Sequence, residues 1–482
     1  MATLNEQIIN EIVRKGLSSI QGAFYNQVSY WRQWYQSFVP EFHLYNVTLA
    51  NGTTVQKEKL SMNLAKKVCE DMSKLLWSNK VQINLDTPEK TEQLCEILEQ
   101  NNFNIMFPRQ LELCSALGTV AFIEYLKDGK PFIEYIGEAD RIIPFQYSAA
   151  RITGFLTVNR YTKIEMDTIM YYTLLTFHEF VNNSYIKYNM IYKSQVDTEL
   201  GEELVFTSIY PNEKEQIVVP NVQYPYFQIL KFPIVNNYDL NNPLGISIFG
   251  NSIDRLKSLD TKFDSFYNEF ICGKKRILID ASALKGIPEA DDQGNITTNL
   301  YFDKNDSTYV ALRGMEQQPI KDIDFNLRYQ EHIESIQSEI NWLSSNVGFG
   351  ENFYSFNGSR PMTATEVISN DSDAYRTKEN YDVVVVECVE GIVRAICQLA
   401  GIQTEEIEII TDFSRFKNDS AEQQRLMQEV NAGITSKVEY RMKVYNEDEM
   451  LAKNKIEEIS SNEPDLNELM GTIEDENNVS ES

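Results

Sequence analysis

The sequence Gly348-Phe-Gly-Glu-Asn-Phe-Tyr-Ser-Phe-Asn-Gly-Ser-Arg-Pro361 follows two stretches in which apolar residues recur at helical spacing. Within each stretch these residues lie three, four or seven positions apart, which places them on one face of a helix that packs against another helix. The two stripes are Ile253, Leu256, Phe263, Phe266 and Phe270, then Ile333, Ile336, Ile340, Leu343 and Val347. Both stripes are narrow and their opposite faces are strongly charged, so neither helix completes a core alone. We expect their remaining neighbours to come from other subunits.

The loop that begins at Gly348 differs from a simple linker. Its three glycines and Pro361 exclude a helix, whereas its four aromatic residues argue against an unstructured connection. Arg360 is its only cation and is opposed by Glu351, so contact with a nucleic acid would be weak and independent of base sequence. Two interpretations follow from the loop itself: a mobile element that lines a channel, or a surface connector whose aromatic residues pack on the rest of the subunit.

A long helix is predicted after this loop, and a small insert is predicted between the two striped helices. Thr363-Ala-Thr-Glu366 is a capping box, so a helix starts there and extends to about residue 400. The β-branched run Val383–Val386 weakens that helix and is compatible with a kink. The insert, residues 277–322, contains the strand-like sequences Ile277-Leu-Ile279 and Tyr309-Val-Ala-Leu312, which indicate a small α/β cap.

The first half of the chain changes from helical to β-rich character. Helices are predicted over 3–38, 60–77, 88–101 and 109–117, with residues 103–108 between the last two. The alternating runs around Lys127-Asp-Gly-Lys130 predict a hairpin with an Asp-Gly turn. Further strands are predicted over 154–161, 170–180, 185–192 and 203–208, and later over 405–410. Residues 421–458 are predicted to be helical with a break at Gly433, and the tail after Ser460, which has seven acidic residues and no basic one, to be disordered.

Length and composition limit the class of protein to which this chain can belong. A chain of 482 residues exceeds one hydrophobic core, so two to four packed modules are expected. The formal charge of -27 excludes a domain that grips nucleic acid through phosphate contacts. The six cysteines form no CxxC pair and are expected to be buried thiols of a reducing cytoplasm. No segment has the pattern of a signal peptide or a membrane span, so secretion and membrane insertion are not expected.

Motifs for catalysis and for metal binding are missing from the sequence. There is no GxxxxGK[ST] loop for a nucleotide phosphate, which excludes an ATP-driven motor of that class. The three histidines, His43, His178 and His332, fall in three different predicted modules and offer no zinc or nucleophile–base motif. Acidic pairs such as Asp291 with Asp292 are expected to be solvated turns. We therefore predict no enzymatic activity, no metal and no cofactor.

Four motifs follow one another along the chain: Met62-Asn-Leu-Ala-Lys-Lys67 with Leu75-Leu-Trp77, Ala116-Leu-Gly-Thr-Val-Ala-Phe122, Asn242-Pro-Leu-Gly-Ile-Ser-Ile-Phe-Gly-Asn-Ser-Ile-Asp-Arg-Leu-Lys-Ser-Leu-Asp260, and Met362-Thr-Ala-Thr-Glu-Val367. In this order they resemble segments of the portal proteins of tailed bacteriophages. The resemblance extends over roughly residues 25–445. It implies an α+β, mainly helical subunit of several domains, with a β-rich wing, a helical stem, a small α/β clip and a helical crown.

The resemblance also implies domain limits. The wing is residues 1–240 completed by 401–418, the first stem helix 241–276, the clip 277–322, the second stem helix 323–347, the tunnel loop 348–362, a spoke helix 363–400, the crown 419–460 and the acidic tail 461–482. In this interpretation the aromatic loop borders the channel.

Three sets of residues follow as candidates. The DNA-facing loop residues would be Phe349, Glu351, Asn352, Phe353, Tyr354, Asn357 and Arg360. The cations of the stem and channel would be Lys257, Lys262, Lys274, Lys275 and Arg276. The stem-packing residues would be Ile253, Leu256, Phe263, Phe266, Phe270, Ile333, Ile336, Ile340 and Leu343.

By this resemblance, the function is a ring at one capsid vertex through which double-stranded DNA is packaged and ejected. Expected partners are other copies of the chain in a ring of twelve, double-stranded DNA bound without sequence preference, the terminase large subunit, a head–tail connector or adaptor, and the major capsid and scaffold proteins. The protein would be assembled in the cytoplasm of the bacterial host and end in the virion, without a membrane partner. Another capsid or head–tail connector ring scaffold is the alternative.

Overall fold

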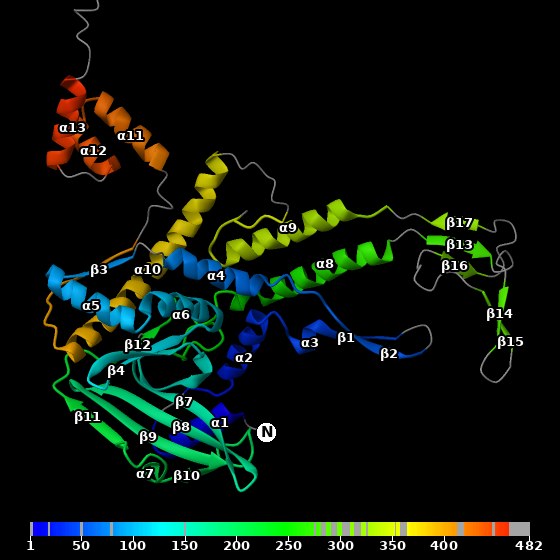
Figure 1. Ribbon diagram of the computed structural model, residues 1–482, viewed down its shortest axis with the longest axis horizontal. Helices are drawn as coiled ribbons and strands as arrows, with labels where there is room; N and C mark the ends of the chain where they lie inside the picture. The colour runs from blue at the N-terminus through cyan, green and yellow to red at the C-terminus, as the bar shows by residue number, and fades with distance from the viewer. Residues whose placement is uncertain are drawn as a thin grey trace, which may run out of the picture. The chain divides into compact units, whose positions relative to one another are not determined.

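The computed structural model contains two compact units, Met1–Thr411 and Asp412–Ser482. The structure describes residues 3–17, 20–48, 52–77, 81–148, 151–273, 276–280, 286–290, 296–300, 309–312, 320–323, 326–351, 353–356, 364–411, 419–445 and 449–461. Helices and strands both contribute to the first unit (Figure 1).

Helices make up most of the first 117 residues. They are α1 (Leu4–Arg14), α2 (Phe24–Tyr35), α3 (Pro40–His43), α4 (Leu64–Leu76), α5 (Pro88–Gln100) and α6 (Phe103–Leu117). Trp31 and Trp34 of α2 are fully buried and anchor this helix in the core. The prediction that residues 103–108 lie between two helices is wrong. They form the start of α6, and the carbonyl group of Pro108 accepts a hydrogen bond from Ser73 Oγ of α4 at 2.6 Å.

Two antiparallel sheets follow. The smaller sheet has the strand order β12-β4-β5, from β4 (Val120–Lys127), β5 (Lys130–Ile136) and β12 (Phe227–Leu230). Its β4–β5 hairpin is the one predicted from the sequence. Asp128 (φ 52°) and Gly129 (φ 78°) both have the positive φ that a tight two-residue hairpin turn requires.

The larger sheet forms a broad curved layer in Figure 1. Its strands are β6 (Ile142–Tyr147), β7 (Ile152–Glu165), β8 (Thr168–Val181), β9 (Ser184–Ser194), β10 (Glu202–Leu204) and β11 (Gln216–Pro220), with both β10 and β11 pairing with β9. The predicted strand over 203–208 is only half correct, because Phe206–Ile209 form a short helix, α7. Phe206 packs there on Tyr172 and Ile191 of the sheet.

A two-stranded ribbon separates α3 from α4. It consists of β1 (Leu44–Thr48) and β2 (Thr54–Glu58), which pair only with each other among the described strands. None of its ten residues is buried.

The helices predicted from the two stripes are α8 (Ile253–Cys272) and α9 (Tyr329–Asn346). Helix α8 starts at Ile253, directly after a short 3-10 turn that Gly250–Ser252 form. The long helix predicted after the loop is α10 (Ala364–Ala400), one α-helix that continues through Val383–Val386.

Strands alone are found in the described part of the insert between α8 and α9. They are β13 (Arg276–Asp280), β14 (Gly286–Ala290), β15 (Ile296–Leu300), β16 (Tyr309–Leu312) and β17 (Ile320–Ile323). Strand β13 pairs with β16 in parallel and with β17 antiparallel, and β14 pairs with β15. The prediction of an α/β cap is therefore corrected to a β structure for these residues.

Two distant segments pair at the far end of α10. Strand β18 (Ile407–Ile410), which follows α10, is antiparallel to β3 (Gln82–Leu85). The predicted strand over 405–410 is thereby confirmed, and its partner strand comes from the N-terminal part of the chain.

The second unit contains α11 (Asp419–Asn431), α12 (Lys437–Tyr445) and α13 (Glu449–Ser461). Gly433 has a φ of +71° in the turn between α11 and α12, as the predicted helix break requires. The tail beyond Ser461 lies outside the described residues.

Candidate functional site

Helices α8 and α9 form an antiparallel pair. Arg255 near the start of α8 lies by Glu339 in the second half of α9, while Glu269 near the end of α8 bonds Arg328 just before α9. A 20-residue helix such as α8 is about 30 Å long. The two helices together form a rod, which we call the α8–α9 rod. The insert lies at the end of this rod that is farthest from the first turn of α8.

Glu339 is the polar centre of this pair. Its carboxylate accepts hydrogen bonds from Ser258 Oγ at 3.1 Å and from Lys262 Nζ at 3.0 Å. Partial burial acts to raise the pKa of Glu339, but the Lys262 hydrogen bond and the nearby positive charges outweigh burial and lower that pKa. Lys262, a predicted channel cation, is thus already neutralised within its own chain.

A second polar group closes the distal end of the pair. The Arg328 guanidinium donates to both oxygens of Glu269, and this contact lowers the pKa of Glu269 to about 2. The ring of His332 lies 5.4 Å from that of Phe266, and its Nε2 is 3.8 Å from Glu269. His332 thus contributes a contact between α9 and α8.

The predicted stem-packing residues fall into three groups by exposure. Leu256, Ile336, Ile340 and Leu343 are buried; Ile253, Phe263, Phe266 and Ile333 are half-buried; Phe270 is 46% exposed. Burial therefore decreases towards the distal end of α8, where Tyr267 and Ile271 are also exposed.

Of the other predicted cations, Lys257 pairs with Asp254 at 3.5 Å on the same helix. Arg276 belongs to β13, and Lys274 and Lys275 lie outside the described residues.

Sequence reasoning missed a buried pair on α8. His43 Nδ1 accepts a hydrogen bond from the backbone N–H of Val39 at 2.8 Å, so Nε2 carries the proton and donates to Asp260 Oδ2 at 3.1 Å. The other oxygen of Asp260 accepts from the backbone N–H of Met62 at 2.8 Å. His43 directly precedes β1 and Met62 lies shortly after β2, so these hydrogen bonds attach the base of the β1–β2 ribbon to α8. We call this base, residues 43 and 60–62, the ribbon root. An aspartate inside an apolar stripe was the available signal, but its partner is 217 positions away.

The loop after α9 is anchored by its aromatic residues. Phe349 is fully buried and stacks on Phe353 with ring centroids 4.5 Å apart, and both contact Tyr354 edge to face. The prediction that Phe349 faces DNA is therefore wrong for this chain, because its side chain lies inside the subunit. Glu351 is exposed, as a DNA-facing position requires.

Polar contacts hold the same loop to three helices. Tyr354 Oη donates to Asp71 of α4 at 2.8 Å, and Thr377 Oγ1 of α10 donates to the carbonyl of Gly348 at 2.6 Å. The side chain of Gln337 on α9 bonds the backbone of Tyr354 and Phe356. Burial, reinforced by the charge of Asp71, raises the pKa of the Tyr354 hydroxyl, which stays protonated as a donor.

Gly348 is required at the start of this loop. Its φ is +90°, and a Cβ atom there would lie 2.6 Å from Thr377 Oγ1. The described part of the loop, residues 348–351 and 353–356, is therefore a fixed connector, which supports the packed alternative there. Asn352, Asn357 and Arg360 lie outside the described residues.

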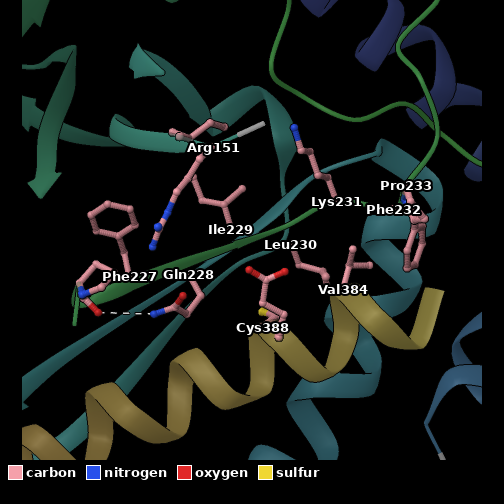
Figure 2. A pocket seen from close by; sticks show the side chains of 13 residues that line it. Arg151, Phe227, Gln228, Ile229, Leu230, Lys231, Phe232, Pro233, Val384 and Cys388 are labelled. Atoms are coloured by element: carbon pink, nitrogen blue, oxygen red, sulfur yellow. Dashed lines mark hydrogen bonds between the residues drawn. The ribbon is translucent and has the colours of Figure 1, made fainter. Parts of the chain in front are cut away.

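A cavity of about 420 Å³ lies between β12 and α10. Figure 2 shows Val384 and Cys388 of α10 on one side and Phe227, Gln228 and Ile229 of β12 on the other. Its charged lining residues are Arg151, Lys231 and Glu387, and Lys231 Nζ already donates to the carbonyl of Pro243 at 2.6 Å. The lining contains no histidine, so this cavity lacks a base for nucleophilic catalysis of the Ser–His or Cys–His type.

The histidines are engaged separately in structural contacts. Burial, with a further contribution from Lys187, lowers the pKa of His178 to about 3, and its Nδ1 lies 2.8 Å from Tyr185 Oη. Across the described residues, no group of three or more His, Cys, Asp and Glu side chains could hold a metal ion. Within the same residues, no helix is both long and apolar enough to span a membrane.

The comparison with known families agrees with this architecture. The family model for phage portal proteins, SPP1 Gp6-like, matches residues 16–464. None of the curated proteins compared with the chain matches it. Since the family match covers most of the chain, including both rod helices, the anchored loop and α10, the protein belongs to the SPP1 Gp6-like family of phage portal proteins.

Proposed function

We propose that twelve copies of this portal protein close side by side into a ring at one capsid vertex, and that double-stranded DNA passes along its axis during packaging and ejection. The family match over residues 16–464 is the observation that carries this proposal. The α8–α9 rod supports it, because the distal face of α8 keeps Tyr267, Phe270 and Ile271 exposed in the single chain. A neighbouring rod would cover them.

The anchored loop limits which groups reach the DNA. With Phe349 buried and Tyr354 bonded to Asp71, we place the DNA-facing part of residues 348–362 at Glu351 and Asn352 and at the stretch beyond Phe356, which includes Asn357 and Arg360. Phe353 then supports the loop by stacking on Phe349. One cation beside one carboxylate gives a weak contact that does not depend on base sequence.

The charge of the chain suits passage of DNA. Each neutralised phosphate adds affinity through counterion release, so a cation-rich lining would retard a moving duplex. The net charge of -27, together with the pairing of Lys262 to Glu339, keeps such contacts few. DNA is then confined by the ring without being held.

Distinct parts of the chain would serve distinct partners. We assign the β-stranded insert, residues 277–322, to a clip that meets the terminase large subunit and later the head–tail connector. Residues 1–240 with 401–418 would form the wing against the major capsid and scaffold proteins, and 419–460 the crown. The chain contributes structure and no catalysis of its own, and assembly takes place in the bacterial cytoplasm before the ring enters the virion.

Electron microscopy of the purified full-length protein tests the ring. A hollow ring of about twelve copies with the α8–α9 rods around the hole is expected, as in closed cyclic assemblies with head-to-tail contacts. Native mass spectrometry of the same sample gives the copy number. A homogeneous monomer at micromolar concentration, or a ring whose rods stand far from the hole, would overturn the proposal.

A further inference from the structure

The β1–β2 ribbon is ordered without a core of its own. All five pairs between Leu44–Thr48 and Thr54–Glu58 are in register, yet every residue of β2 is exposed. An isolated two-stranded hairpin is only marginally stable in water. The ribbon therefore has free surface on both faces for a partner.

The root of this ribbon and helix α9 contact opposite sides of α8. Ser258, Lys262 and Glu269 point towards α9 or the residue before it. Asp260 and Asp264 bond the backbone of the two residues, 62 and 60, that follow the ribbon. At about 100° per residue, positions 260 and 264 lie about 160° from position 262 around the helix.

The side of α8 that holds the ribbon root is bare over its last turns. Asp260 is buried there, whereas Tyr267 and Ile271 on the same side are exposed by 51% and 42%. Phe270, about 80° from Asp260 around the helix and in contact with Phe266, is exposed by 46%. We call these three residues the bare end of α8. Each chain therefore presents an apolar surface beside its own ribbon. Lys57, exposed on the ribbon, makes no ion pair within the described residues.

Another side of the rod is acidic. Glu331, Glu334, Ser338 and Trp342 are exposed on α9 and share one face, because they follow each other at steps of three or four residues. We call these four residues the outward stripe. At about 100° per residue, Glu334 lies about 140° around α9 from Glu339, which faces α8. Neither carboxylate of the stripe forms a salt bridge within the part of the chain that the structure describes.

The two surfaces also lie at matching heights along the rod. The two carboxylates of the stripe flank His332, whose ring contacts Phe266 in the distal half of α8. They are therefore level with Phe263 and Phe266, about one helical turn from the bare end of α8. Trp342 lies nearer the first turn of α8, where the guanidinium of Arg255 is 5.9 Å from its ring.

We propose that the outward stripe of α9 in one copy docks between the ribbon and the bare end of α8 in the neighbouring copy. Lys57 then faces the two carboxylates of the stripe, and the body of α9 covers the bare end. Trp342 meets Phe38 and Leu60, which are exposed at the ribbon root. This inference rests on the proposed ring and identifies its two contact surfaces. The occupant is a second copy because the two surfaces are complementary in charge and lie on opposite sides of one rod, as a head-to-tail contact requires.

Charge reversal in the full-length chain tests this contact. Either Lys57→Glu alone or Glu331→Lys with Glu334→Lys should raise the concentration for half-assembly into rings by about tenfold or more, measured by mass photometry. A chain that carries all three substitutions should have a half-assembly concentration within about threefold of that of the natural chain, since each copy then offers reversed charges on both surfaces. Glu96→Lys with Glu99→Lys on α5 is the matched control, because both residues are exposed and equally spaced.

Two outcomes overturn the inference and leave the ring proposal standing: charge-reversed chains that assemble like the control, or a triple variant no better than the others. Absence of rings from the natural chain instead removes the proposed function itself.

Carbodiimide cross-linking of mixed isotope-labelled natural chains gives a second measurement. An amide between Lys57 and Glu331 or Glu334 of different chains is expected, with the Lys67–Asp71 pair at 2.7 Å as the internal positive control. Detection of the control link without any link from Lys57 to the stripe contradicts the docking arrangement.

Discussion

At the scale of single residues, Glu124 of β4 is the most unusual side chain. It is fully buried, and neither carboxylate oxygen has a hydrogen-bond partner within the described structure. Burial raises the pKa of Glu124 well above its usual value, so the group is a neutral acid in the folded chain. Its neighbours Tyr135 of β5 and Cys388 of α10 are also protonated, because burial raises the pKa of both.

Glu124 should make the folded chain less stable at alkaline pH. The folded state keeps a proton that the unfolded state releases above the ordinary carboxyl pKa. The associated stability is complete below that pKa and is lost progressively as the pH rises towards the pKa in the folded state. Glu124→Gln removes this dependence and should increase the free energy of unfolding by about 1–3 kcal/mol at pH 8, with little change near pH 4.5.

Urea denaturation followed by tryptophan fluorescence at several pH values measures this difference. Glu134→Gln is the control, since Glu134 is exposed on the adjacent strand β5. An equal effect of both substitutions, or a gain for Glu124→Gln that does not grow with pH, would contradict the assignment of a buried neutral acid.

At the scale of elements, the apolar stripes of α8 and α9 serve two kinds of packing. Leu343 of α9 is fully buried within the chain, whereas Phe270 of α8 is 46% exposed and touches Phe266 edge to face. Both belong to helices of similar pattern. The difference arises because the distal end of α8 extends past the part of the chain that covers its first turns.

Alanine substitution should separate the two kinds of packing. Leu343→Ala should reduce the free energy of unfolding of the single chain by about 2–5 kcal/mol, the cost of a core cavity. Phe270→Ala should cost only about 1 kcal/mol, the value of its aromatic contact, while weakening ring formation. Denaturation below the assembly concentration, paired with mass photometry above it, measures both effects. A single-chain loss for Phe270→Ala as large as for Leu343→Ala would show that Phe270 is packed within its own chain.

Local signals predicted much of the element structure, and long-range contacts account for the errors. The Asp128-Gly129 turn was predictable because its φ values depend on those two residues. The helical start of α6 at Phe103 was not, since Pro108 suggested a break and the packing of α6 on α4 overrides it. The DNA-facing position of Phe349 followed from the resemblance, whereas its burial depends on an aromatic cluster that forms only when the loop folds back. Of the candidate site, the rods were predictable from periodicity, but the His43–Asp260 attachment joins residues far apart in sequence.

At the scale of the whole molecule, the last strand of the first unit, β18, pairs with a strand from the N-terminal part of the chain. Strand β18 pairs with β3, Thr411 Oγ1 lies 3.4 Å from Asp382 Oδ2, and Asp86 accepts from the backbone N–H of Glu406 at 2.8 Å. That backbone hydrogen bond and the contact with Lys90 lower the pKa of Asp86. The strand after α10 thus ties the C-terminal end of this unit to its beginning.

A chain that ends at Thr411 should fold and keep the main unfolding transition of the full chain. A chain that ends at Ala400 should melt at a lower temperature, because it loses the β18–β3 pairs and the bonds to Asp86. Circular dichroism melts of the two truncated chains give the comparison. Equal melting temperatures would show that β18 adds no stability, and an unfolded 1–411 chain would show that the first unit depends on residues 412–482.

In the head-to-tail docking proposed above, the opposite positions of α9 and the ribbon root on α8 would also determine how growth of an assembly stops. Two such chains could not satisfy both surfaces in a symmetric pair, so joining would proceed through open arcs with one unmatched end of each kind. A copy in which one of the two surfaces is disrupted would act as a terminator, because it can join one end of an arc and no further copy can then add at that end. In a cell that makes intact and spoiled copies together, a minority of terminators would leave most arcs unclosed, and the defect would be genetically dominant.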